Sequence, residues 1–182
     1  MKGARHRDGQ PESLVDAFGF LVHIDRHAGT VIEGTGPDGQ PYRVVQTDDY
    51  GYLEGVNGDD GECYDVYLGL DRTADRVFVV TQVKASTGAY DEQKAMLGYP
   101  TKRAAEDTYK AHTHPAMFGR IGCMTLPAFR AQVKAHLESG AAVFRVETDE
   151  DGEELACLEE YEAGPLSEPE PPSEPVPSTE KP

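Results

Sequence analysis

An acid-rich turn that leads directly into an apolar segment is the feature that most limits how this chain can fold. Residues 59–68 read DDGECYDVYL, so Asp60, Glu62 and Asp65 surround one glycine ahead of a β-branched and aromatic run. Crowded carboxylates repel one another, and a folded protein tolerates them when a cation or protons compensate the charge. Hard oxygen ligands of this kind suit Mg²⁺ or Mn²⁺ better than zinc. The alternative interpretation is a solvated β-turn, because Asp and Gly are common turn residues.

The net charge of −16 is distributed unevenly along the 182 residues. From Glu147 onward the chain has 13 acidic residues and a single base, Lys181, so most of the excess negative charge lies at this end. An acidic chain without a basic stripe argues against a nucleic-acid partner. No apolar run reaches 18 residues and no signal-peptide core follows the first methionine, so we expect a cytoplasmic protein with no membrane contact.

The composition divides the chain into one domain and two flanks. A length of 182 residues favours a single domain with a real core. We expect a mobile arm over residues 1–16 and a domain over 17–163, which consists of a core at 18–140 and a late acidic hairpin at 141–163. Residues 164–182 hold seven of the 13 prolines, with Glu and Ser between them, a composition typical of a disordered tail.

The core alternates between turn-rich and apolar segments. We expect strands at 18–24, 30–33, 42–46, 63–70, 76–83, 90–97 and 120–124. Helical periodicity predicts helices at 101–112 and 125–140, with Thr101 as a possible N-cap and Gly140 at the end of the second helix. Short strands followed by helices indicate either an α+β domain or a small barrel with helices outside, and the pattern alone does not choose between them.

The segment around the acidic turn resembles a known protein signature. Residues 50–52 read YGY, and Tyr50 lies ten positions before Asp60, the first acid of a D-G-E-C-Y-D sequence. This stretch resembles the signature of the soluble, Mg-dependent family I inorganic pyrophosphatases, although Glu62 replaces an Asp and Cys63 replaces a Pro. It is most similar to the pyrophosphatase-like domains of phages and prophages, which share a D-E-x-K-x-M-L-G-[FY] segment that is matched at 91–99.

The resemblance implies a fold and a set of site residues. The implied fold is α+β, a five-stranded OB-like β-barrel with two helices packed outside. The implied ligands of Mg²⁺, or of Mn²⁺ in its place, are Asp60, Glu62, Asp65 and Glu92. The implied phosphate-binding and catalytic residues are Lys94, Tyr50, Tyr109, Lys110 and Arg43, of which Arg43 is the nearest match to an arginine that we could not place in register.

The match lacks one metal-binding acid of the family. That acid precedes the acid-x-Lys pair by several residues, but residues 82–87 here read QVKAST. Asp91 could substitute for it, yet on a regular strand its side chain would point away from Glu92.

The expected activity is Mg-dependent hydrolysis of pyrophosphate, or of a related small phosphoanhydride, by a metal-activated water. One alternative is a catalytically degenerate scaffold or a virion-associated binding protein. Another is a phosphohydrolase that acts on a different pyrophosphate-containing nucleotide. For a phage-encoded chain the expected location is the host cytoplasm, with virion association and homo-oligomerisation left open.

Overall fold

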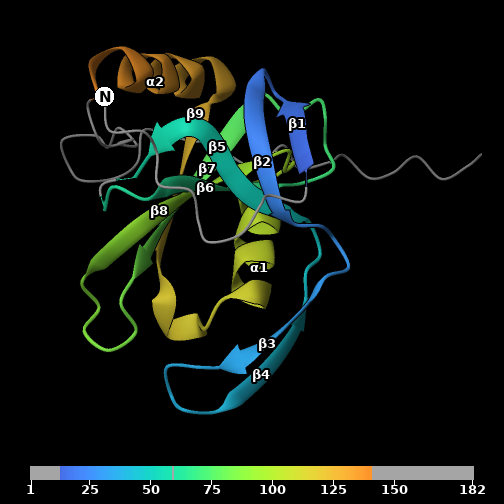
Figure 1. Cartoon of the computed structure of the whole chain (residues 1–182), viewed down its shortest axis with the longest axis vertical. Helices are drawn as coiled ribbons and strands as arrows, with labels where there is room; N and C mark the ends of the chain where they lie inside the picture. The colour runs from blue at the N-terminus through green and yellow to red at the C-terminus, as the bar shows by residue number, and fades with distance from the viewer. Residues whose placement is uncertain (1–12, 59, 141–182) are drawn as a thin grey trace, which may run out of the picture.

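The computed structural model describes residues 13–58 and 60–140, which form one large sheet, a separate hairpin and two α-helices (Figure 1). The strand order in the large sheet is β1-β2-β5-β6-β8-β7-β9, and β3 pairs with β4. The strands are β1 (Ser13–Ala17), β2 (Phe20–Arg26), β3 (Val31–Thr35), β4 (Pro41–Val45), β5 (Asp49–Asn57), β6 (Cys63–Leu68), β7 (Arg76–Val83), β8 (Tyr90–Leu97) and β9 (Phe118–Thr125). The helices are α1 (Lys102–His112), the short 3₁₀ helix η1 (Pro115–Met117) and α2 (Leu126–Ser139).

The sheet is open, and this corrects the expected five-stranded OB-like barrel. Within residues 13–58 and 60–140, strand β1 pairs only with β2 and strand β9 only with β7, so these two edges do not meet. The described residues form nine strands rather than five. The extra pairing comes from β1, which folds back on β2 through a tight turn, and from β5, which pairs with both β2 and β6. The expected α+β class with two helices is confirmed.

Most of the expected elements are present near their expected bounds. Strands β7 and β8 begin and end where the sequence pattern placed them. The side chain of Thr101 accepts a hydrogen bond from Ala104 N and caps α1, and Gly140 ends α2 in a left-handed conformation. Neither α-helix in the described part of the chain is long and apolar enough to cross a membrane.

The described residues include only part of the expected arm and of the expected domain. Strand β1 begins at Ser13, within the segment 1–16 that we expected to be an arm, and ends at Ala17, the first residue of the expected domain. Residues 1–12, the late hairpin at 141–163 and the tail at 164–182 lie outside the described residues, so these limits stay predictions.

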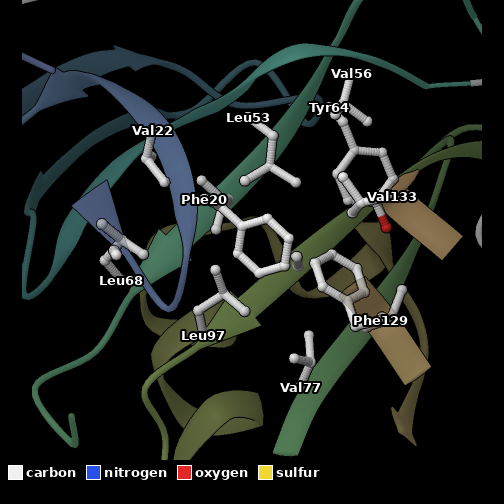
Figure 2. Close-up of a cluster of buried hydrophobic side chains, with 14 of the residues drawn as sticks. Phe20, Val22, Leu53, Val56, Tyr64, Leu68, Val77, Leu97, Phe129 and Val133 are labelled. Carbon is white, nitrogen blue, oxygen red and sulfur yellow. The ribbon is translucent and has the colours of Figure 1, made fainter. Parts of the chain in front are cut away.

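The large sheet buries apolar side chains on both faces. One face packs against α2, where Phe129 and Phe20 meet edge to face with ring centroids 5.5 Å apart (Figure 2). The other face packs against α1, where Tyr109 is fully buried beside Tyr67. Side chains alternate along a strand, so Tyr64 lies on the α2 face and Tyr67 on the α1 face. The polar groups described below lie on the α1 face.

Candidate functional site

A buried ion pair lies between neighbouring strands of the large sheet. Strands β6 and β8 are parallel, and their register places Asp65 directly beside Lys94. Because Asp65 is two residues before Tyr67, and Lys94 two residues before Met96, both side chains face α1. Tyr50 reaches the same place from β5, where it pairs with Tyr67. The expected site residues Tyr50, Asp65 and Lys94 therefore come together.

The three side chains form a compact hydrogen-bonded group. Lys94 Nζ donates to Asp65 Oδ2 over 2.5 Å and to the Tyr50 hydroxyl oxygen over 3.1 Å, and that hydroxyl donates to Asp65 Oδ2. Asp65 is fully buried, and Lys94 exposes 6% of its surface. Burial alone would lower the pKa of Lys94, but the Tyr50 oxygen, Asp65 and Glu92 outweigh it and hold the pKa well above its usual value. Lys94 is thus a fixed positive charge.

Glu92 joins this group from the same strand as Lys94. Its Oε1 lies 3.0 Å from Lys94 Nζ, because residues i and i+2 of a strand face the same way. Burial raises the pKa of Glu92, and the charges of Asp65 and Asp60 add to the rise while Lys94 opposes it. Because burial is the main cause of this rise, the charged form of Glu92 is disfavoured even beside a lysine. A cation near Glu92 would therefore be stabilised.

Gln82 belongs to this hydrogen-bonded group, although the sequence pattern did not indicate it. It lies on β7 opposite Glu92, and its Nε2 donates to Glu92 Oε1 over 2.7 Å. The Gln82 Oε1 accepts a hydrogen bond from the Tyr109 hydroxyl over 2.8 Å. The available signal was a polar residue at the buried end of the apolar strand 76–83, on the same face as Phe78 and Val80. Gln82 therefore connects Tyr109 of α1 to Glu92 of the sheet.

Asp91 also reaches this group, which corrects the expectation that it points away from Glu92. Its Oδ2 accepts a hydrogen bond from Gln82 Nε2 over 3.0 Å. The register of β7 and β8 shifts between Gln82 and Val83, and an irregularity of this kind re-aims neighbouring side chains. As a result Asp91 and Glu92 both contact one amide.

The two α1 residues of the expected site have different environments. Tyr109 is fully buried, and burial raises the pKa of its hydroxyl above the usual value, so it stays a proton donor at neutral pH. Lys110 is partly exposed, forms an ion pair with Glu106 one turn earlier, and has its Nζ 4.3 Å from the Phe118 ring centroid. Tyr109 is thus tied to the buried group through Gln82, whereas Lys110 is held at the surface.

The acidic turn that precedes β6 is exposed. Asp60 Oδ1 accepts a hydrogen bond from the backbone N–H of Glu62 over 2.9 Å. This is a local turn in which an Asp side chain bonds to the backbone two residues later. Asp60 still acts on Glu92 electrostatically. Glu62 is exposed, and among the described residues no contact joins its carboxylate to the buried group.

The carboxylates supply suitable donor atoms for a divalent cation, although they do not enclose one. Within residues 13–58 and 60–140, no group of three or more His, Cys, Asp or Glu side chains is arranged to hold a metal ion. Mg²⁺ commonly takes only one or two carboxylates and completes its shell with water and substrate oxygens. The donor chemistry of Asp65 and Glu92, with Asp60 nearby, therefore fits such an ion.

Arg43 lies apart from the other expected site residues. It is on β4, which pairs with β3 in a sheet of its own, and Figure 1 shows this hairpin beyond the end of α1. Its Nε donates to Glu33 Oε1 over 2.9 Å, and both side chains are exposed. In the described part of the chain, no contact joins Arg43 to the group around Lys94.

The sequence was compared with curated proteins and with models of protein families. No curated protein matches the sequence significantly. The likeness to phage and prophage domains therefore stays a prediction. A family model described as Inorganic Pyrophosphatase matches residues 9–134, which is more than half of the chain and includes every residue of the site described above. The chain therefore belongs to the inorganic pyrophosphatase family.

Proposed function

We propose that the protein hydrolyses inorganic pyrophosphate to two phosphates with the help of Mg²⁺. The observation that carries the proposal is the buried Lys94, which contacts Asp65, Glu92 and Tyr50 on one sheet face in a chain of this family. Cleavage of a phosphoanhydride needs a nucleophilic water, in-line geometry and compensation of charge on the phosphate oxygens. The fixed positive charge of Lys94 would compensate charge on the phosphate oxygens.

The carboxylates would hold the metal. Asp65 and Glu92, with Asp60 and Glu62 of the neighbouring turn, are the residues that we assign to it, and Mn²⁺ would satisfy the same oxygen donors. When bound, a divalent ion lowers the pKa of a coordinated water and neutralises phosphate charge.

The remaining residues would bind and orient the substrate. Lys94 and Tyr50 are held in place by their hydrogen bonds, so their dipoles and charge need no rearrangement as charge develops on phosphate. Tyr109 donates through its neutral hydroxyl, and Lys110 would release Glu106 to pair with the more strongly charged phosphate. Arg43 would reach the substrate only if its hairpin moved.

The first test is phosphate release from pyrophosphate by the full chain, with and without Mg²⁺. Other pyrophosphate-containing nucleotides, assayed in parallel, test the alternative substrate class. Lys110→Ala should lower turnover by about 10²–10³-fold, the usual loss when one group that stabilises transition-state charge is removed. Lys134→Ala is the matched control, because Lys134 is also a helical lysine paired with a glutamate one turn away. Absence of Mg-dependent release from the wild-type protein would refute the proposal.

A second candidate is a domain that binds phosphoanhydrides without cleaving them. The observation that favours it is Gln82, whose neutral amide contacts both Asp91 and Glu92 and leaves the site without a further carboxylate on β7. Under this alternative the wild-type protein would bind methylenediphosphonate, a diphosphate mimic that cannot be hydrolysed, but would release no phosphate from pyrophosphate. The same two measurements therefore separate the two candidates.

A further inference from the structure

Arg26 lies over the ring of a proposed site residue. Its guanidinium carbon is 4.6 Å from the centroid of the Tyr50 ring. Arg26 pairs with Tyr50 across β2 and β5, after a shift in register between Ile24 and Arg26. Such irregularities re-aim side chains and are common beside functional sites. The irregularity therefore accounts for the placement of Arg26 above Tyr50.

Among the acids of the described residues, none pairs with the guanidinium of Arg26. Across the residues that the structure describes, Arg26 forms no ion pair and no side-chain hydrogen bond, and its contact is with the Tyr50 ring. Other arginines are engaged: Arg43 pairs with Glu33, Arg103 pairs with Asp107, and Arg130 donates twice to the Phe18 carbonyl oxygen. A partly buried arginine that stacks on an aromatic ring keeps its N–H edge free for an anion.

Arg26 and Lys94 act on the same small region. Lys94 Nζ is 5.5 Å from the Tyr50 ring centroid and bonds to its hydroxyl, while Arg26 covers the ring. Burial raises the pKa of neighbouring Tyr67, and the charges of Lys94 and Arg26 both oppose that rise. Two cations near one tyrosine match a ligand that carries two anionic groups, because each phosphate gains a separate counter-charge.

We propose that Arg26 binds one phosphoryl group of the diphosphate through the N–H edge of its guanidinium, while Lys94 faces the other. This inference rests on the proposed function, and it names the feature that selects a diphosphate over a monophosphate. Arg26 forms a two-point contact with the phosphate oxygens, a geometry that the planar guanidinium favours.

The test measures ligand binding by calorimetry on the full chain in the presence of Mg²⁺, with methylenediphosphonate and inorganic phosphate as probes. Arg26→Met keeps an unbranched side chain against the Tyr50 ring but removes the charge. It should weaken methylenediphosphonate binding by about 10- to 100-fold, the loss typical of a hydrogen bond to a charged group, and inorganic phosphate binding by less. Arg103→Met, at an exposed arginine paired on α1, is the control and should bind like the wild type.

Arg26→Lys gives a second readout if Arg26→Met does not fold. It keeps the positive charge over the ring but loses the planar N–H edge, so its affinity should lie between those of the wild type and Arg26→Met. Equal affinity of either variant and the wild type for methylenediphosphonate would overturn the inference, as would a wild-type protein that binds no methylenediphosphonate. A wild type that binds the probe through Arg26 but releases no phosphate would refute hydrolysis alone. Normal hydrolysis by Arg26→Met would refute the role of Arg26 alone.

Discussion

Gln82 Nε2 donates a hydrogen bond to Glu92 Oε1 over 2.7 Å, across the register pair that β7 and β8 form. The same amide group also contacts Asp91, so a neutral side chain lies between two carboxylates. An amide donor compensates part of the negative charge without adding any. Gln82 therefore reduces the positive charge that Asp91 and Glu92 need from a bound cation.

The substitution Gln82→Glu tests this relationship. It would place a third carboxylate beside Asp91 and Glu92, so the metal-free protein should melt at a lower temperature through like-charge repulsion. Millimolar Mg²⁺ should then raise the melting temperature by more than it does in the wild type, because the ion binds the native state. Melting curves in EDTA and in Mg²⁺ measure both effects.

Gln82→Met is the matched control for that experiment. It removes the hydrogen bonds of the amide but adds no charge, so it should lower stability without enlarging the Mg²⁺ effect. If the Mg²⁺ shift of Gln82→Glu were no larger than that of Gln82→Met, this account of Gln82 would be wrong.

The ion pair of Asp65 and Lys94 should dominate the stability of the site. Lys94→Met leaves Asp65 charged and fully buried, and breaking a buried pair on one side typically costs about 3–5 kcal/mol. Adding Asp65→Asn removes the uncompensated charge, so the double variant should be more stable than Lys94→Met alone. Urea denaturation of the wild type, the single variant and the double variant measures the difference. Greater loss in the double variant would contradict this account of the pair.

The sequence predicted the individual strands and helices of this fold better than the way in which the strands pair to form an open sheet. The apolar run at 76–83 and the turn ahead of 90–97 identified two strands, and the cap at Thr101 identified a helix start, because each signal depends on neighbouring residues. Whether a sheet closes into a barrel depends on which distant strands pair. The YGY segment contributes a long strand, β5, and Gly51 permits its close approach to β2, since a Cβ at Gly51 would lie 1.8 Å from the His23 carbonyl oxygen. That contact is not visible in the sequence pattern.

The side-chain arrangement of the candidate site was predictable where two residues are two positions apart on a strand, as Glu92 and Lys94 are. Gln82 was not predicted, because its partners lie on a different strand and on α1, and an amide is not a typical metal ligand. The contact of Asp91 with Gln82 depends on a shift in register that single-strand periodicity does not reveal.

Glu92 should make the stability of the metal-free protein depend on pH. Burial raises its native pKa above the ordinary value of 4.5, so the native state binds this proton more tightly than the unfolded chain does. The associated stabilisation is complete below about pH 4.5 and is lost as the pH rises through the raised native pKa. Glu92→Gln should remove this loss and melt at a higher temperature than the wild type at neutral pH.

Melting temperatures in EDTA between acidic and neutral pH measure that effect. Glu138→Gln, at an exposed glutamate that pairs with Lys134 on α2, is the control and should follow the wild-type curve. Parallel curves for Glu92→Gln and the wild type would show that Glu92 does not control the pH dependence.

Asp60 offers the sharpest test of the metal, because its contribution can be separated from folding. Asp60 Oδ1 accepts the N–H of Glu62 two residues later, and an Asn at this position keeps that bond while losing the charge. Asp71 makes the same turn with the N–H of Thr73, so Asp71→Asn is a control of equal local structure. In EDTA both variants should melt close to the wild type.

Mg²⁺ at 100 times its Kd stabilises a native state by about 2.7 kcal/mol. Asp71→Asn should keep the resulting shift in melting temperature and Asp60→Asn should lose most of it, because only Asp60 acts on Glu92. Equal shifts in the two variants would remove Asp60 from the metal site.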